Sequence, residues 1–255
     1  MKSLSQLLIE SSGLFLKTFL KLLGATLSYF GCFVLSLIAI LVVGVLSMFL
    51  LSLTGWVYTQ VVLGIVIGIL VISAIAILSF MYMIGIIKII QSENTDQNLT
   101  INEAFKESWV LLNPTAWIAL LAGVKVILWS LLLIIPGVFF AIYYSFSLFS
   151  FLIDGKRGIE ALVFSKSMVK ANIGKFVGNL LTVNILGLVF YLIFKKIISL
   201  TFGIPDKMHG NFLAEIGGVI GIAISVFIQF YQYAFSYLLY EEIKKPVTPI
   251  SLKTA

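Results

Sequence analysis

Charged residues are scarce in this sequence of 255 residues, and histidine and cysteine are almost missing. Asp, Glu, Lys and Arg make up 11% of the chain, with one histidine, His209, and one cysteine, Cys32. A single cysteine excludes an intrachain disulfide. Metal sites built on Cys and His need clustered ligands, and neither an HExxH nor a CxxC motif occurs. The sequence therefore predicts no metal site and no cofactor.

Motifs of the common enzyme classes are also missing. The sequence holds no GxSxG, Walker A or GxGxxG pattern. Hydrolysis inside a membrane would need a nucleophile with a base or a pair of carboxylates, and no such set falls within an apolar stretch. The formal net charge is +6, but the basic residues are scattered and form no run. We therefore expect a protein that is not an enzyme and has no nucleic-acid partner.

Long apolar runs are what the chain has in place of these motifs. Residues 22–87 hold 66 positions without one charged residue or histidine, and the mean hydropathy of the chain is +1.12. A bilayer core about 30 Å thick needs roughly 20 apolar residues per helix. The pattern predicts an all-α, polytopic membrane helical bundle with six spans, at about 24–51, 60–87, 116–135, 138–153, 176–194 and 217–239.

Two of the predicted connections differ in character. Residues 52–60, SLTGWVYTQ, suit an interfacial turn because they combine Gly, Trp and Tyr. The third and fourth spans meet at Pro136-Gly137, a turn pair that leaves almost no loop. The 116–153 hairpin is therefore expected to be tight and short, and whether it fully crosses the bilayer stays open.

The distribution of basic residues predicts the orientation. With six spans both termini face one side, and the terminal segments together with loops 88–115 and 154–175 carry 13 of the 17 basic residues. Lys195, Lys196 and Lys207 fall on the opposite side. The positive-inside rule then places both termini in the cytoplasm and the chain in the cell (cytoplasmic or inner) membrane.

Three amphipathic segments are expected to lie at the cytoplasmic interface. Thr100 and Glu103 form a capping box that opens a helix ended by Asn113-Pro114. Segment 158–172 has an apolar side that includes Ile159, Leu162, Val163 and Val169, and segment 3–12 is a third candidate. These segments predict interfacial helices that bind lipid headgroups or a partner.

A weak internal match links two of these segments. Glu103-Ala104-Phe105 with Ser108 aligns on Glu160-Ala161-Leu162 with Ser165 at a constant offset of 57. Each segment precedes an apolar hairpin. We therefore predict one membrane domain, 1–255, that is built from three parallel units of an interfacial helix and a hairpin, 1–99, 100–157 and 158–255.

A family resemblance covers chiefly residues 130–185. It rests on Ile135-Pro136-Gly137, on Asp154 and on segment 158–172, GIEALVFSKSMVKAN. In these residues the chain resembles bacterial six-span integral membrane proteins of largely unknown function, which are similar to the membrane domain associated with glycerophosphoryl diester phosphodiesterases. The resemblance implies a bacterial cytoplasmic membrane. It does not extend to catalysis, because the catalytic domain of those enzymes uses paired histidines and acidic metal ligands.

Lys125 is the main anomaly among the predicted spans. It lies about nine residues, or ~14 Å, from either end of the third span, farther than a lysine stem comfortably reaches. In one interpretation it is a counter-charge for an anionic substrate or lipid headgroup. In the other it is neutral through burial, or its hairpin sits shallowly enough to reach interfacial water.

Polar stripes give the remaining candidate residues. Gln229 and Gln232 recur at helical spacing with Ser225 and Ser236 in the last span, Tyr143 heads a similar stripe in the fourth, and Asn184 lies in the fifth. Such side chains either line a hydrophilic path or join helices to one another. The candidate ligand-binding set in the bundle interior is Lys125, Tyr143, Asn184, Gln229 and Gln232; the candidate cytoplasmic headgroup or partner contacts are Lys156, Arg157, Lys166 and Lys170.

Two function classes follow from the sequence. The first is a non-enzymatic membrane protein that transports or shelters a small or amphipathic, lipid-like and anionic molecule. The second is a structural or regulatory membrane protein whose cytoplasmic helices bind lipid or a partner. Membrane lipids are the expected partners in both classes, and a homo-oligomer or an unidentified membrane partner stays open. A cavity that reaches Lys125 would favour the first class, and an exposed groove along the cytoplasmic helices the second.

Overall fold

The computed structural model describes residues 2–52, 57–202 and 212–245, and all regular structure in these ranges is helical. Six stretches are long and apolar enough to cross a membrane, as the sequence predicts. The chain is therefore an all-α membrane protein. The helices are α1 (Leu4–Ser52), α2 (Val57–Asn94), α3 (Ile101–Leu132), α4 (Ile134–Tyr144), α5 (Ser147–Asp154), α6 (Ile159–Ala171), α7 (Ile173–Phe202) and α8 (Phe212–Lys244).

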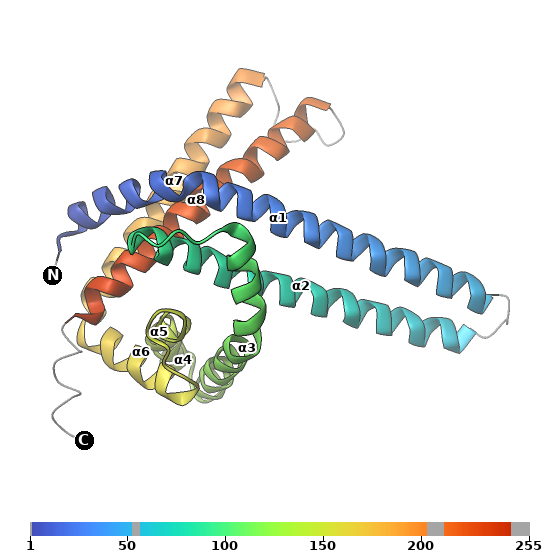
Figure 1. Ribbon diagram of the computed structural model, residues 1–255, viewed down its shortest axis with the longest axis horizontal. Coiled ribbons are helices and arrows are strands. Elements are labelled where there is room, and N and C mark those ends of the chain that lie inside the picture. Colours follow the sequence, from blue (N-terminus) through green and yellow to red (C-terminus); the bar gives the residue numbers. More distant parts are fainter. Residues whose placement is uncertain (1, 53–56, 203–211, 246–255) are drawn as a thin grey trace.

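Three helical hairpins share one base and leave it in different directions (Figure 1). They are α1 with α2, α3 with α4, and α7 with α8. We call the shared base the hub, residues 4–29, 81–118, 144–176 and 230–245. We call the projecting parts the arms, residues 30–52, 57–80, 119–143, 177–202 and 212–229.

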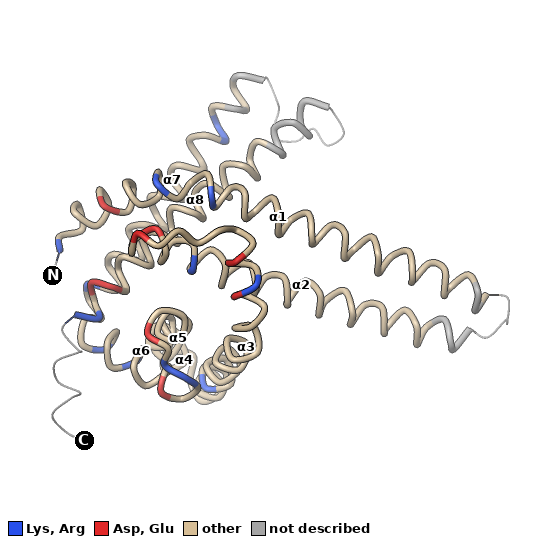
Figure 2. The backbone as a smooth tube through the Cα atoms, in the orientation of Figure 1, with Lys and Arg blue, Asp and Glu red and all other residues tan. Residues whose placement is uncertain are grey.

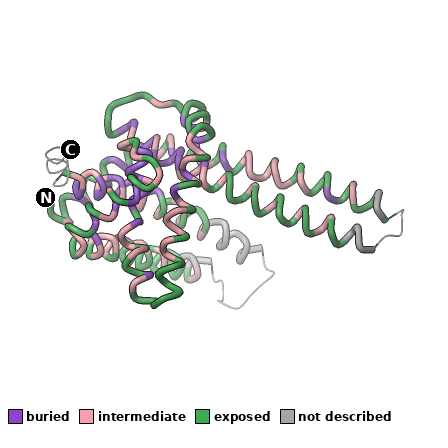
Figure 3. The backbone as a smooth tube through the Cα atoms, turned by 90° about the horizontal axis from the view of Figure 1, so that it is seen from below, coloured by how far each residue is buried: buried purple, intermediate pink, exposed green. Residues whose placement is uncertain are grey.

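Large buried side chains are concentrated in the hub. Leu22, Ile87 and Phe235 are each at most 1% exposed. The Phe146 ring, in the break between α4 and α5, lies 5.1 Å from the Phe176 ring of α7 and 5.4 Å from the Tyr240 ring of α8, measured between centroids. Figure 3 shows the buried positions gathered at this end of the molecule. Tertiary packing therefore joins all three hairpins at the hub.

The arms expose their apolar side chains instead. Val43, Ile72 and Leu192 are more than half exposed, and most of the described large apolar residues of the arms are exposed. Charges lie mainly on the hub (Figure 2), and among the described residues of the arms only Lys125, Lys195, Lys196 and Glu215 are charged types. An apolar surface of this extent is covered by lipid in a membrane protein.

Ion pairs close the base of the α1/α2 hairpin. The Lys17 ammonium lies 2.7 Å from the Asp96 carboxylate and also donates to the Glu93 carbonyl oxygen, and Lys21 pairs with the Glu93 carboxylate. The Lys17 hydrogen bond holds the pKa of Asp96 below its usual range. These pairs fix the separation of the two helices where they leave the apolar zone.

Helix α3 runs on past the point where the sequence predicts an end. The capping box of Thr100 and Glu103 is present, as predicted. The predicted end at Asn113-Pro114 is wrong, because Pro114 lies inside a continuous helix of 32 residues. Proline removes one backbone donor, but Thr115 and Ile118 behind it are buried, and their packing holds the helix together. Segment 3–12 likewise belongs to the 49-residue helix α1 and is not a separate helix.

The turn between α3 and α4 also differs from the prediction. Only Leu133 leaves the helical conformation, with φ −158° and ψ 137°, while Pro136 and Gly137 lie in the first turn of α4. A Cβ atom on Gly137 would lie 2.8 Å from the Cα atom of Ser130 in α3. Glycine at this position therefore permits the close approach of the two helices and does not make the turn.

The fourth predicted span, 138–153, is interrupted. The helix is interrupted at the turn of Ser145 and Phe146, where Phe146 has φ −99° and ψ 11°, so that α4 and α5 are separate helices. Segment 158–172 forms α6 as expected, but its apolar residues divide between two sides. Leu162 and Val169 are buried in the hub, whereas Ile159 and Val163 are each 59% exposed. The start of α1, the start of α3 and all of α6 lie in the hub, and the three-unit repeat stays a prediction.

Candidate functional site

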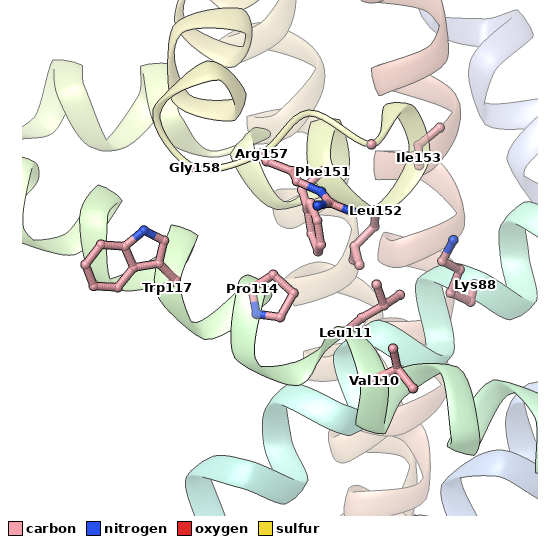
Figure 4. A pocket seen from close by; sticks show the side chains of 11 residues that line it. Lys88, Val110, Leu111, Pro114, Trp117, Phe151, Leu152, Ile153, Arg157 and Gly158 are labelled. Atoms are coloured by element: carbon pink, nitrogen blue, oxygen red, sulfur yellow. The ribbon is translucent and has the colours of Figure 1, made fainter.

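An open cleft of about 770 Å³ lies on the hub between α2, α3, α5 and the loop 155–158 (Figure 4). Its wall is mostly apolar, and none of its lining residues is acidic. Lys88 and Arg157 supply the basic side chains of the lining. The lining residues are Lys88, Val110, Leu111, Pro114, Trp117, Phe151, Leu152, Ile153, Gly155, Arg157 and Gly158.

Two glycines shape the loop that carries Arg157. Gly155 (φ 69°) and Gly158 (φ 54°) both lie in the left-handed region, which residues with a Cβ atom rarely adopt. The Gly155 amide donates to the Phe151 carbonyl oxygen at 2.9 Å, which ends α5. The Lys156 amide donates to the Ser150 carbonyl oxygen at 3.2 Å. The chain thus reverses within a few residues, and Arg157 lies over the cleft (Figure 4).

Neighbouring acidic residues are already paired with lysines. Asp154 accepts from the Lys244 ammonium at 2.8 Å and from the Tyr240 hydroxyl. Glu160 pairs with Lys156 at 2.6 Å, and this pair holds the pKa of Glu160 below its usual range, so that its carboxylate is ionised at neutral pH. Because these acidic residues are paired, the uncompensated charge of this part of the surface comes from the remaining cations.

Lys88 and Arg157 are those remaining cations at the cleft. Neither side chain makes a hydrogen bond or an ion pair within the described part of the chain. Lys88 is partly buried, so its charge is less well solvated than that of a fully exposed lysine. Two uncompensated cations beside an apolar wall match the chemistry of an anionic, amphipathic ligand.

The depth of the cleft in a membrane follows from its own residues. Lys88 is the first charged residue after the 66 uncharged positions of the first hairpin. Trp117, at the opposite side of the cleft, is 56% exposed. Lysines at span ends and exposed tryptophans both favour the headgroup layer. The cleft therefore fits the level of the lipid headgroups.

Two residues of the predicted interior set, Lys125 of α3 and Tyr143 of α4, lie on the α3/α4 hairpin, where Lys125 contacts the neighbour of Tyr143, Tyr144. The Lys125 ammonium is 5.7 Å from the centroid of the Tyr144 ring, a cation–π distance. The Tyr143 carbonyl oxygen accepts from the Ser165 hydroxyl of α6 at 2.7 Å. This part of α4 is thus joined to α6 in the hub.

The other three residues of that set lie on a different hairpin. The Gln232 amide donates to the Asn184 side-chain oxygen at 3.4 Å and so joins α8 to α7, while Gln229 is exposed. The α7/α8 and α3/α4 arms leave the hub in different directions (Figure 1). The structure therefore forms two local groups and does not bring all five residues together. Their roles in ligand binding stay predictions.

The four predicted headgroup contacts have separate surroundings. Lys156 is paired with Glu160, Arg157 lines the cleft, Lys166 lies 5.1 Å from the centroid of the Phe140 ring, and Lys170 is exposed. Lys88 and Trp117 are not among the candidate residues predicted from the sequence. The position of Lys88, directly after the uncharged run, was a usable signal, whereas nothing in the sequence brings it next to Arg157.

Comparisons with known proteins identify no relative: no family model, curated protein or solved structure matches the chain. The family resemblance of residues 130–185 therefore stays an expectation. In the described residues no group of three or more His, Cys, Asp or Glu side chains could hold a metal ion. The cleft with its two cations, Lys88 and Arg157, is therefore the candidate functional site.

Proposed function

We propose that this chain is a non-enzymatic integral membrane protein that binds an anionic, lipid-like molecule in the hub cleft and shelters or transports it. One observation carries the proposal: Lys88 and Arg157, without acidic partners, line an open cleft whose wall is otherwise apolar. An anionic headgroup would contact the two cations. Its hydrocarbon part would lie on the apolar wall and pass Trp117 into the bilayer.

The proposal includes a location and an orientation. The charged hub would face the cytoplasm and both termini would lie there, because the hub holds most of the basic residues. The cleft would then take its ligand from the cytoplasmic leaflet of a bacterial inner membrane, which is the location that the family resemblance implies.

Binding of a defined anionic lipid tests this function. The full chain, purified in detergent, is titrated with phosphatidylglycerol or with phosphatidylcholine of the same chain length, and the bound lipid is counted by native mass spectrometry. Replacing both cations, Lys88→Gln with Arg157→Gln, should weaken phosphatidylglycerol binding roughly 30-fold. This estimate takes about 1 kcal/mol for each basic residue near an anionic surface.

Lys106→Gln is the matched control, because Lys106 is an exposed cation of α3 that does not line the cleft. It should leave phosphatidylglycerol binding unchanged. Equal binding of the two lipids by the unmodified chain would overturn the proposal, as would a double variant that binds phosphatidylglycerol as well as the control does.

A structural or regulatory role is the second candidate, and the outer face of α6 favours it. Ile159 and Val163 are exposed on this helix, with Lys166 and Lys170 on the same element. An exposed apolar pair beside lysines suits contact with a membrane surface or a partner. In that case Val163→Asp should abolish the cellular function of the protein but leave lipid binding at the cleft unchanged. This result would distinguish the two candidates.

A further inference from the structure

The tip of the α3/α4 hairpin is entirely apolar. Residues 131–139, LLLIIPGVF, include no charged residue and no polar side chain. Leu131, Ile134 and Ile135 are each more than 70% exposed, so nothing in the described part of the chain covers them. A surface of this kind belongs in hydrocarbon and not in the water beyond a membrane.

The connections at the ends of the other two hairpins have the opposite composition. Residues 52–60 read SLTGWVYTQ, and residues 203–211 read GIPDKMHGN. Both contain the polar, aromatic or charged residues expected where a chain reaches the far headgroups. The α3/α4 hairpin is thus the exception among the three.

The length of the hairpin also differs from that of a crossing pair. Trp117, in the cleft at headgroup level, is 16 residues before Leu133, which corresponds to about 24 Å along a helix. The hydrocarbon core alone is about 30 Å thick. On the other side of the tip, α4 has 11 residues, or about 16 Å, before the break at Ser145. Counted from Trp117 and up to this break, each limb is shorter than the hydrocarbon core, although Ile101–Leu132 and Ile134–Asp154 taken whole are long enough to cross it.

The backbone at the tip suits a position inside hydrocarbon, where unpaired polar groups are costly. Only Leu133 is non-helical, and its amide donates to the Trp129 carbonyl oxygen at 3.1 Å. The Leu133 carbonyl oxygen accepts from the Gly137 amide at 3.3 Å. Pro136, in the first turn of α4, has no amide proton and so removes one donor that a helix start leaves without a partner.

From these observations we propose that the α3/α4 hairpin is re-entrant: it dips into the cytoplasmic leaflet, ends near the bilayer midplane and returns to the same side. Its partner surface is the acyl chains of that leaflet. The proposal uses the headgroup depth of the hub cleft but does not depend on whether the cleft binds a ligand. Four helices, α1, α2, α7 and α8, then cross the membrane, and both termini stay on one side.

A re-entrant hairpin also accounts for Lys125. Eight residues, or about 12 Å, separate it from Leu133. With the tip near the midplane, about 15 Å deep, Lys125 lies a few Å below the cytoplasmic headgroups, within reach of a snorkelling side chain. Tyr144, whose ring is 5.7 Å from the Lys125 ammonium, is at the same level and carries a hydroxyl that suits the interface. Lys125 then no longer places a charge in the middle of the membrane.

Single cysteines in the full chain test the depth of the tip. In a Cys32→Ser background, Leu133→Cys, Ser52→Cys and Asn102→Cys are expressed in cells and treated with a membrane-impermeant maleimide. We expect Ser52→Cys, at the end of α1, to react from outside, and Asn102→Cys, at the start of α3, to react only in opened cells. Leu133→Cys should react in neither case and should react after solubilisation in detergent.

A spin label at position 133 in vesicles of phosphatidylethanolamine and phosphatidylglycerol gives the depth directly. High accessibility to oxygen with low accessibility to a polar nickel complex, the signature of the midplane, would support the proposal. Reaction of Leu133→Cys from outside, or a label depth at the far headgroups, would overturn it. Ile135→Cys, two residues along the exposed tip, repeats both measurements where the first variant is poorly produced.

Discussion

The hub and the arms of this molecule are built on different principles. In the hub, aromatic side chains from α5, α7, α8 and the α4/α5 break contact one another, and ion pairs join α1 to α2 and α5 to α8. In the arms, the apolar residues are largely exposed (Figure 3), as expected of a surface that lipid covers. The hub therefore determines which helix lies next to which, whereas the arms need mainly a helical, apolar sequence.

Truncation of an aromatic side chain should give the largest difference in unfolding free energy between the hub and the arms. Phe176 is fully buried in the hub, and Phe176→Ala should lower the free energy of unfolding by about 3–5 kcal/mol. Phe49, in the α1 arm, is 61% exposed, so Phe49→Ala should change it by less than about 0.5 kcal/mol. Denaturant titration in detergent micelles measures both, and equal losses would contradict the division into hub and arms.

Loss of the ion pair and hydrogen bond that join Asp154 of α5 to Lys244 and Tyr240 of α8 should give the next largest loss of stability. Asp154→Asn keeps the shape of the side chain but removes the charge that accepts from Lys244 and Tyr240. We expect a loss of about 1.5–3 kcal/mol in unfolding free energy, the range for hydrogen bonds to charged groups. Glu160→Gln, on the other side of the same loop, is the control, since its pair with Lys156 is exposed and should matter less. A larger loss of unfolding free energy in the control would show that the α5/α8 contact is not a main contribution to the stability of the hub.

Close packing inside an arm can be tested at a glycine. Gly137→Ala places a Cβ atom 2.8 Å from the Ser130 Cα atom and should destabilise the α3/α4 hairpin by about 1–3 kcal/mol. Gly123→Ala, in α3, meets nothing within 4 Å and should be neutral or stabilising by up to about 1 kcal/mol. Thermal unfolding followed by circular dichroism compares them. The contrast is lost if Gly137→Ala is as stable as the parent chain.

The exposed ion pair at the base of α1 and α2 should have the smallest effect. The lowered pKa of Asp96 means that the folded state favours its ionised form. The pair therefore stabilises the fold above the ordinary pKa of an aspartate, and this contribution is lost as the pH falls through the lowered value. Asp96→Asn, which suits the φ of 54° equally well, should be slightly less stable than the parent chain at pH 7, and the difference should be smaller at pH 3. Parallel unfolding curves at the two pH values test this sign.

Much of the fold follows from the sequence, because lipid imposes a simple rule on helix length and composition. The apolar runs and the capping box at Thr100 predict helices that the structure contains. The continuation of α3 through Pro114 could not be predicted from the sequence, because it depends on the burial of Thr115 and Ile118 by other helices. The break at Ser145 and Phe146 has no glycine or proline to mark it, and it follows from the packing of Phe146.

The candidate site was predictable only in part. Arg157 could be selected from its place in a basic loop, but its proximity to Lys88 depends on the way in which α2, α3 and α5 meet. The polar stripes suggested one shared interior. The structure instead places Asn184 with Gln232 on one hairpin and Lys125 beside Tyr144 on another. Helical spacing shows which residues share a face of one helix, and it does not show toward which neighbour that face turns.

The ion pairs at the base of the first hairpin have a consequence for synthesis. Lys17 and Lys21 find their partners at Asp96 and Glu93, so every residue needed to close α1 against α2 lies within the first 96 residues. Chains are made from the N-terminus at about 5–20 residues per second. The α1/α2 hairpin is thus complete several seconds before residue 245 is added, and it gives the later helices an assembled surface in the membrane on which to fold.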